Sequence, residues 1–312
     1  MRLLRRWPGC VLLALFLISS LSGCGNKPVA ESGLKVPFKL ERNKIIIPTR
    51  INGSRPMKLI LDTGMRFDGV YLFRKELADE IDMTDAIDVR VPGAGSGEAS
   101  TAKMIESGSL TFGNVTVDSQ RVIISSSPHT QRFPTDGVIG WNLFGHYAAE
   151  VDYDRELIIL HDTAEVAPDS SWTMVPVTMK DGLPFFDAEV EVVDGEVVPV
   201  TLYIDLASSD ALEMLVGEEQ KFSMPDSLEQ GNLATGLSGE INGSRGISKR
   251  LRIGDYSLSL IPTSFAPAKV RSKQEGADGI LGNGCMSRFN TIYDYAHSRL
   301  YLKPSKYYGE SF

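Results

Sequence analysis

The sequence predicts a mainly β protein made of two homologous lobes, and three observations support this prediction. A set of motifs occurs twice in the same order, most apolar segments are short and rich in β-branched residues, and glycine-containing turns separate these segments. The chain has 312 residues, of which 42% are hydrophobic and 23% are charged. It can therefore bury a sizeable core in each lobe, and this composition excludes an intrinsically disordered chain.

The internal repeat is the strongest of the three observations. Four motifs recur at a constant spacing of about 142 residues. The pairs are Ser96-Gly97-Glu98 with Ser238-Gly239-Glu240, Leu110–Asn114 with Leu251–Asp255, Asp136–Gly140 with Asp278–Gly282, and Asp152-Tyr153 with Asp294-Tyr295. Four matches in one register indicate a duplication. They predict a first lobe over residues 36–165, a linker over 166–172 and a second lobe over 173–312.

Local patterns assign most segments of both lobes to strands. Short apolar runs predict first-lobe strands at 45–47, 57–61, 110–117 and 122–124. In the second lobe, Asp194-Gly195 interrupts an apolar run over 190–200, which predicts a β-hairpin. Two segments, 73–81 and 210–216, have a helical pattern. Both are short, so the predicted class remains mainly β.

Residues 1–23 have the pattern of a secretory signal peptide. Arg2, Arg5 and Arg6 form a basic start, and the apolar run that follows is too short to cross a bilayer as a helix. The segment Leu21-Ser22-Gly23-Cys24 resembles a bacterial lipobox, in which the cysteine is acylated, with palmitate for example, and becomes the mature N-terminus. An ordinary signal peptide that happens to end near a cysteine is the alternative.

Lipidation of Cys24 predicts a lipoprotein of the bacterial cell envelope, with residues 24–35 as its tether to the membrane. By resemblance to other lipoproteins, Gly25 stands where an inner-membrane retention signal would place Asp. This favours the outer membrane, facing the periplasm. Cys10 leaves with the leader, so Cys285 remains as the possible thiol, and we expect it to be a small buried residue.

Charge and residue spacing exclude several classes of function. The formal net charge is −8 and becomes more negative when the three arginines leave with the leader, so an acidic surface would repel the phosphates of a nucleic acid. The histidines show no metal-ligand spacing, and we expect neither a metal nor another cofactor. They are His129, His146, His161 and His297.

One motif of the first lobe points to chemistry. The apolar run 59–61 ends on Asp62, followed by Thr63 and Gly64. A carboxylate at the end of a buried strand has a fixed direction. The Thr63 hydroxyl can bind backbone or a facing lobe, and Gly64 lets another segment approach where a Cβ would clash.

About 75 residues further on stands the sequence Val138-Ile139-Gly140. Together with the motif at Asp62, this pattern resembles the bacterial retropepsin-like proteins of the aspartic protease clan, over nearly all of the mature chain and in both repeats. The resemblance implies two acid-protease-like β-barrel lobes around a central cleft. It also implies that residues 138–140 pass beneath the catalytic Asp62, and that the glycine-rich segment with Gly93, Gly95 and Gly97 is a mobile flap.

In that family a second acid faces the first. At the equivalent place stands Asp205, followed by Leu206 and Ala207 in place of a hydroxyl residue and a glycine. The counterparts of residues 138–140 are Ile280, Leu281 and Gly282. The expected catalytic pair is thus Asp62 and Asp205, but Leu206 cannot make the hydroxyl bonds that join the two acid loops.

Two functions follow from the resemblance. The first is an aspartic endopeptidase, in which paired carboxylates activate a water against a peptide substrate. The second is an envelope lipoprotein that keeps the fold, binds peptides or proteins, and has lost catalysis in lobe two. We expect a monomer, with a homodimer that pairs two Asp62 residues as the alternative. The repeated Asp136 and Asp278 each precede a glycine, so we expect them to close turns.

Overall fold

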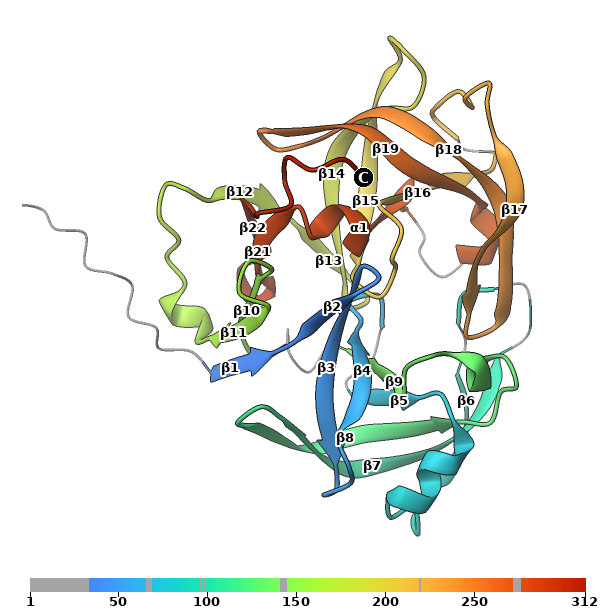
Figure 1. The fold of residues 1–312 in the computed structure, drawn as a ribbon, viewed down its shortest axis with the longest axis vertical. Helices are drawn as coiled ribbons and strands as arrows, with labels where there is room; N and C mark the ends of the chain where they lie inside the picture. The colour runs from blue at the N-terminus through green and yellow to red at the C-terminus, as the bar shows by residue number, and fades with distance from the viewer. Residues whose placement is uncertain are drawn as a thin grey trace, which may run out of the picture. The chain divides into compact units, whose positions relative to one another are not determined.

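The described strands form three sheets, two of which are copies of one pattern (Figure 1). The computed structural model describes residues 34–312, except residues 66–68, 92, 96, 98, 141–144, 219 and 272–275. Residues Gly33–Phe312 form one compact unit. The predicted signal peptide, Cys24 and most of the tether lie outside the described residues.

The first-lobe sheet has eight strands in the order β2-β3-β4-β9-β5-β8-β7-β6. Strand β3 pairs with β4 over residues 46–49 and with β7 over residues 49–51, so the sheet folds back on itself like a barrel. The strands are β2 (Lys39–Glu41), β3 (Lys44–Ile51), β4 (Met57–Leu61), β5 (Val70–Leu72), β6 (Ile87–Val91), β7 (Ser100–Phe112), β8 (Val115–Ser125) and β9 (Gly137–Ile139).

The second-lobe sheet repeats this order, strand for strand, as β13-β14-β15-β20-β16-β19-β18-β17. Strand β14 pairs with β15 and with β18, as β3 does with β4 and β7. The strands are β13 (Thr178–Lys180), β14 (Leu183–Glu191), β15 (Val197–Asp205), β16 (Leu212–Val216), β17 (Glu229–Gly236), β18 (Gly239–Ile253), β19 (Tyr256–Pro267) and β20 (Gly279–Gly282). The predicted mainly β, two-lobed, acid-protease-like fold is confirmed.

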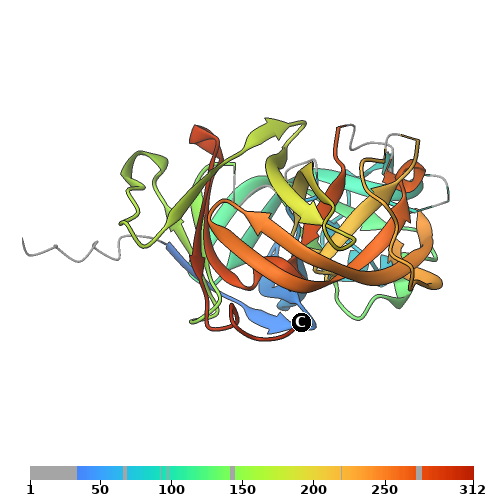
Figure 2. The same cartoon turned by 90° about the horizontal axis from the view of Figure 1, so that it is seen from above.

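A third sheet takes three strands from each half of the chain, in the order β1-β11-β10-β21-β22-β12. Its green and red strands run side by side in Figure 2. The two halves meet where β10 and β21 pair, with Val151 opposite Thr291. The strands are β1 (Leu34–Pro37), β10 (Ala148–Asp152), β11 (Leu157–His161), β12 (Thr173–Pro176), β21 (Phe289–Asp294) and β22 (Arg299–Pro304).

Helices are short and few in the described part of the chain. The 3-10 helices are Lys75–Glu80, Thr130–Arg132, Thr163–Glu165, Ala268–Arg271 and Tyr295–His297, and the α-helix α1 is Asn283–Met286. The helix expected over 73–81 is present as Lys75–Glu80. None of the described helices is long and apolar enough to cross a membrane.

Two local predictions were wrong. The segment 210–216 is not helical, because Leu212–Val216 is the inner strand β16, paired on both sides by β19 and β20. A strand that is buried on both faces does not alternate between apolar and polar residues, and four of the five residues of β16 are apolar. The run 110–117 is two strands that turn at Gly113-Asn114. The hairpin at Asp194-Gly195 is confirmed, with Glu191 opposite Val197.

Apolar side chains from both lobes join one continuous core, which includes Ile47, Leu61, Leu202 and Leu281. Separate clusters lie on the opposite faces of the lobe sheets.

Candidate active site

Asp62 and Asp205 occupy equivalent ends of equivalent strands. Asp62 directly follows β4, which runs parallel to β9 with Leu61 opposite Ile139. Asp205 ends β15, which runs parallel to β20 with Ile204 opposite Leu281. The Asp62 N–H also donates to the Ile139 carbonyl at 2.8 Å. Each acid is therefore carried by a central strand that a second parallel strand supports.

The two carboxyl groups border the same small space. A Cβ placed on Gly64 would lie 3.1 Å from both Cγ and Oδ2 of Asp205, and 3.2 Å from Oδ1 of Asp62. Both acids are only half-buried. A side chain at residue 64 would therefore intrude between them, which is the physical reason for a glycine at this position.

Backbone N–H groups orient both carboxylates. The Gly64 N–H donates to Oδ1 of Asp62 at 2.7 Å. The N–H groups of Ala207 and Ser208 donate to Oδ1 of Asp205 at 3.0 and 3.2 Å. The replacement of glycine by Ala207 leaves this interaction in place, because the bond comes from the backbone.

Burial and the facing carboxylate raise the pKa of Asp62 to about 7. Burial has the larger effect, and the charge of Asp205 adds to it. The Gly64 N–H and the Lys44 ammonium act in the opposite direction. Two carboxyls that share one site do not ionise together, so the pair retains one proton up to near-neutral pH.

Thr63 joins the two acid loops across the lobes. Its buried hydroxyl donates to the Ile204 carbonyl at 2.8 Å and accepts the Leu206 N–H at 3.0 Å. Leu206 has no hydroxyl with which to return these bonds, and its side chain is fully buried in the core. The side-chain hydrogen bonds between the acid loops therefore come from Thr63 of lobe one and are not returned by Leu206, as the sequence predicted.

The residues expected beneath the acids lie on strands that pair in parallel with the acid-bearing strands in both lobes. Val138 and Ile280 face the clusters outside the core, and Ile139 and Leu281 face into it. The two closing glycines pass close to other segments. A Cβ on Gly140 would come within 2.4 Å of Met65 Cε, and one on Gly282 within 2.2 Å of the Asp210 carbonyl oxygen.

The glycine-rich segment meets a second hairpin that the sequence reasoning missed. Gly97 N–H donates to the Ser238 carbonyl at 2.7 Å, and Ser238 N–H donates to the Ala94 carbonyl at 3.0 Å. Gly93 N–H donates to Ser238 Oγ at 3.2 Å. Gly95 has φ +130°, and a Cβ there would lie 2.6 Å from the Ser238 carbonyl carbon. Each lobe thus contributes a hairpin, and the two tips bind each other.

A sequence signal for the second hairpin existed. The repeat of Ser96-Gly97-Glu98 as Ser238-Gly239-Glu240 marks equivalent positions of the two lobes. Leu237 of the second hairpin packs against the same cluster as Ala207 of the second acid loop, a cluster that includes Met65. The second hairpin and the acid loops therefore pack against the same apolar cluster.

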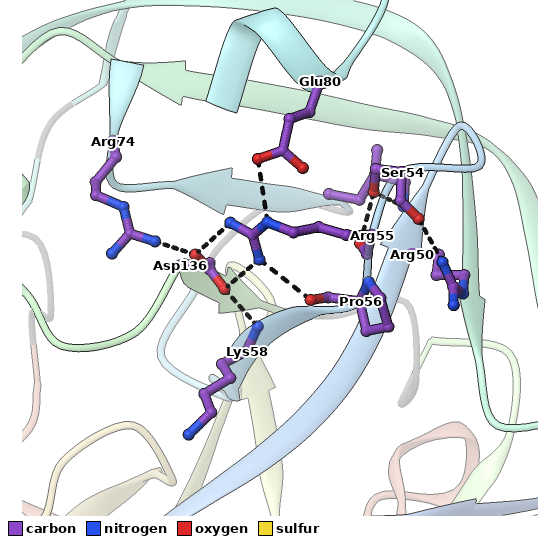
Figure 3. A network of polar contacts seen from close by, with 9 residues as sticks. Arg50, Ser54, Arg55, Pro56, Lys58, Arg74, Glu80 and Asp136 are labelled. Carbon is purple, nitrogen blue, oxygen red and sulfur yellow. Dashed lines mark hydrogen bonds and ion pairs between the residues drawn. The ribbon is translucent and has the colours of Figure 1, made fainter. Parts of the chain in front are cut away.

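Asp136 precedes β9, and its carboxylate binds the backbone of β4 rather than closing a local turn as expected; it also anchors an ionic network (Figure 3). Its carboxylate accepts the Lys58 N–H at 2.7 Å and binds Arg55 at 3.2 Å, and it also binds Arg74. Burial alone would raise the pKa of Asp136, but these partners together lower it. Glu80 binds the same Arg55 at 3.1 Å. The Asp136 carboxylate therefore supports the fold and does not face the acid pair.

Other reactive side chains lie outside the acid pair. Cys285 is fully buried, and burial raises the pKa of its thiol to about 12, so it is a core residue, as expected. The tyrosines Tyr71, Tyr153, Tyr203 and Tyr295 are buried as well. Among the described residues, no group of three or more His, Cys, Asp or Glu side chains could hold a metal ion.

Comparisons with known proteins agree with this arrangement. Residues 47–143 match the family model described as aspartyl protease. The aspartic proteinase from Irpex lacteus is similar in structure over 89% of this chain and 99% of its own, with a TM-score of 0.56 and 14% sequence identity. At that identity the likeness shows the fold alone. A comparison with curated protein sequences finds no match.

The family match covers the lobe that holds the complete Asp62-Thr63-Gly64 motif, and the structural likeness extends over the second lobe as well. The recognition made from the motifs is confirmed: residues 47–143 of the first lobe match the model of the retropepsin-like aspartyl protease family, and the two lobes together have the fold of an aspartic proteinase.

Proposed function

We propose that the protein is an aspartic endopeptidase that cleaves peptide bonds with Asp62 and Asp205 as its catalytic pair. The observation that supports this most directly is the placement of both carboxyls around the space beside Gly64. The pair is assembled from equivalent strand ends of one chain, so no second copy is needed. A peptide or protein chain is the proposed substrate.

The proposed mechanism uses one shared proton. In the proposed cycle Asp62, whose pKa is raised to about 7, begins with the shared proton, and Asp205 has the role of the base. Asp205 takes a proton from a water while the water oxygen bonds to the peptide carbonyl carbon. Asp62 gives its proton to the carbonyl oxygen. The C–N bond of the tetrahedral intermediate then breaks: the amine takes its proton from Asp205, which had received the water's proton, and Asp62 takes a proton back from a hydroxyl of the intermediate as the product carboxyl group forms.

Cleavage of a diverse peptide library by the purified protein tests the proposal. Wild-type protein should cleave from acidic to near-neutral pH, and both Asp62→Asn and Asp205→Asn should lose activity, because an amide cannot exchange the shared proton. A mimic of the tetrahedral intermediate should bind wild-type protein, most strongly below neutral pH.

Two outcomes would contradict the proposal in different ways. An Asp205→Asn variant that retains most activity would mean that two first lobes pair as a homodimer. Wild-type protein that neither cleaves any peptide nor binds the mimic would leave a peptide-binding protein without catalysis.

We also propose that acylated Cys24 anchors the protein in the bacterial envelope, in the outer membrane. The lipobox-like segment before Cys24 supports this. Cys24→Ala should move the protein from the membrane to the soluble periplasmic fraction. Equal membrane association of the variant and wild type would contradict the anchor.

A further inference from the structure

The β2–β3 hairpin of lobe one and its counterpart in lobe two differ in the residue that begins the second strand. Both hairpins turn through two residues with positive φ, Arg42-Asn43 in lobe one and Asp181-Gly182 in lobe two. The residue that begins the next strand is Lys44 in lobe one and Leu183 in lobe two. Leu183 is fully buried in an apolar cluster of its own lobe. Lys44 instead points toward the other lobe.

The turn of lobe one binds the second acid loop, which we define as residues 205–210. The Lys44 ammonium donates to the Ala207 carbonyl. The Asn43 side-chain amide donates to the Ser209 carbonyl at 3.2 Å. Asn283 of α1 donates in turn to the Asn43 carbonyl at 3.0 Å. Asn43 and Lys44 of lobe one therefore hold the second acid loop, to whose contact with lobe one Leu206 contributes no hydroxyl hydrogen bond.

We propose that Lys44 is a positioning residue for the acid pair: it holds the second acid loop through the Ala207 carbonyl and provides the positive charge that favours one ionised carboxylate. The inference rests on the proposed function. It assigns to Lys44 part of the role that a hydroxyl at residue 206 would have.

The charges around Lys44 agree with this role. Burial lowers the pKa of Lys44, while the carboxylates of Asp205, Asp62 and Asp210 oppose that effect and favour the charged ammonium. Conversely, Lys44 lowers the pKa of Asp62.

Other charged groups near this hairpin have their own partners. Glu41, opposite Lys44 in the hairpin, is exposed and pairs with Lys58 at 3.6 Å. Arg245 faces Asp210 from β18 at 3.5 Å. The carboxylates that act on Lys44 are therefore mainly those of the two acids and of Asp210.

The test compares Lys44→Met, Lys44→Arg and the control Lys58→Met. Lys58 is an exposed lysine of lobe one whose side chain pairs with Glu41. In Lys44→Met, the loss of positive charge should raise the pKa values of the acid pair. The acidic and alkaline limbs of the plot of kcat/KM against pH should then both shift to higher pH, by roughly one pH unit. Lys44→Arg should keep the wild-type limbs, and Lys58→Met should not move them.

A second measurement needs no activity. NMR titration of protein with 13C-labelled aspartate should show the Asp62 carboxyl titrating at higher pH in Lys44→Met than in wild type. Lys44→Gln replaces Lys44→Met in both assays if the methionine variant is recovered unfolded.

The outcomes separate the inference from the proposed function. An unchanged Asp62 titration in the neutral variant would overturn the inference, and so would a fall in kcat/KM that is equal at every pH. A wild-type protein without peptidase activity would contradict the proposed function, while a raised Asp62 pKa in Lys44→Met would still support the effect of Lys44 on the pair.

Discussion

The two lobes have the same strand order but hold their acids in different ways. In lobe one, Thr63 reaches across and makes two hydrogen bonds to the backbone of lobe two. In lobe two, Leu206 occupies the matching position and packs in the core. In this contact the lobe-one acid loop supplies a side-chain hydroxyl, and the lobe-two acid loop supplies backbone groups.

The equivalent aspartates before β9 and β20 also differ between the lobes, in the partners of their side chains. Asp136 and Asp278 each accept a backbone N–H from the neighbouring strand, that of Lys58 at 2.7 Å and that of Thr201 at 2.8 Å. Asp136 binds two arginines besides, whereas Asp278 pairs with Lys221, whose side chain is 52% exposed.

This comparison shows which features a duplication retains when one copy diverges. The backbone bond of each aspartate is kept, because it joins the segment before β9 or β20 to the strand that carries the acid of its lobe. The side-chain interactions have become unequal. This combination of a retained backbone and altered side chains agrees with the comparisons, in which the family model matches residues in lobe one and the structural likeness covers both lobes.

The largest effect is expected from Thr63→Val, which removes the one hydroxyl that joins the acid loops. The change leaves the Ile204 carbonyl and the Leu206 N–H without this partner, so stability should fall by about 2–3 kcal/mol. Peptidase activity should fall with it, because the two carboxyls lose their common support. Chemical denaturation and kcat/KM measure the two effects.

Leu206→Val is the matched control in lobe two. It alters packing but removes no hydrogen bond, so its loss of stability should be about 1 kcal/mol, as for a buried side chain that loses one methylene. Equal losses of activity in the two variants would contradict a special role for the Thr63 hydroxyl.

A smaller effect is expected from Asp136→Asn, compared with Asp278→Asn. Asparagine can still accept the backbone N–H, so both changes test the charge. Asp136→Asn should cost about 1–3 kcal/mol, because the carboxylate is buried between two arginines, and Asp278→Asn less than about 1 kcal/mol.

The pH dependence of the Asp136→Asn effect has a defined sign. The pKa of Asp136 is lowered in the folded protein, so its contribution is present above the ordinary value of about 4 and is lost as the pH falls through the folded value. The stability difference between wild type and Asp136→Asn should therefore shrink on acidification. A difference that stays constant to strongly acidic pH would contradict this account.

The effect of Asp62→Asn on stability should have the opposite sign, a gain. The pKa of Asp62 is raised to about 7, so ionisation of this carboxyl opposes folding as the pH rises from about 4 to about 7. The asparagine variant should melt a few degrees higher than wild type above pH 7, and at the same temperature below about pH 4. A lower Tm for the variant at pH 8 would show that the acid pair is not strained.

Sequence by itself determined the duplicated mainly β architecture, the two acids and the one-sided join at Leu206. These features depend on local patterns: apolar strands, a motif at a strand end, and repeats at a constant spacing. The same local reasoning was wrong for residues 210–216, because β16 is buried on both faces of its sheet and therefore has no alternating pattern.

Only the tertiary structure decided how the lobes act on each other. The sheet shared through β10 and β21, the contact of Gly97 with Ser238, and the reach of Lys44 to Ala207 each join residues more than 130 positions apart. No local pattern encodes such contacts, since they depend on how two folded lobes pack. A lysine at the start of a strand looks like a solvated residue in the sequence. It becomes part of the candidate active site because the opposite lobe places a carbonyl and two carboxylates near it, and Asp62 of its own lobe adds a third.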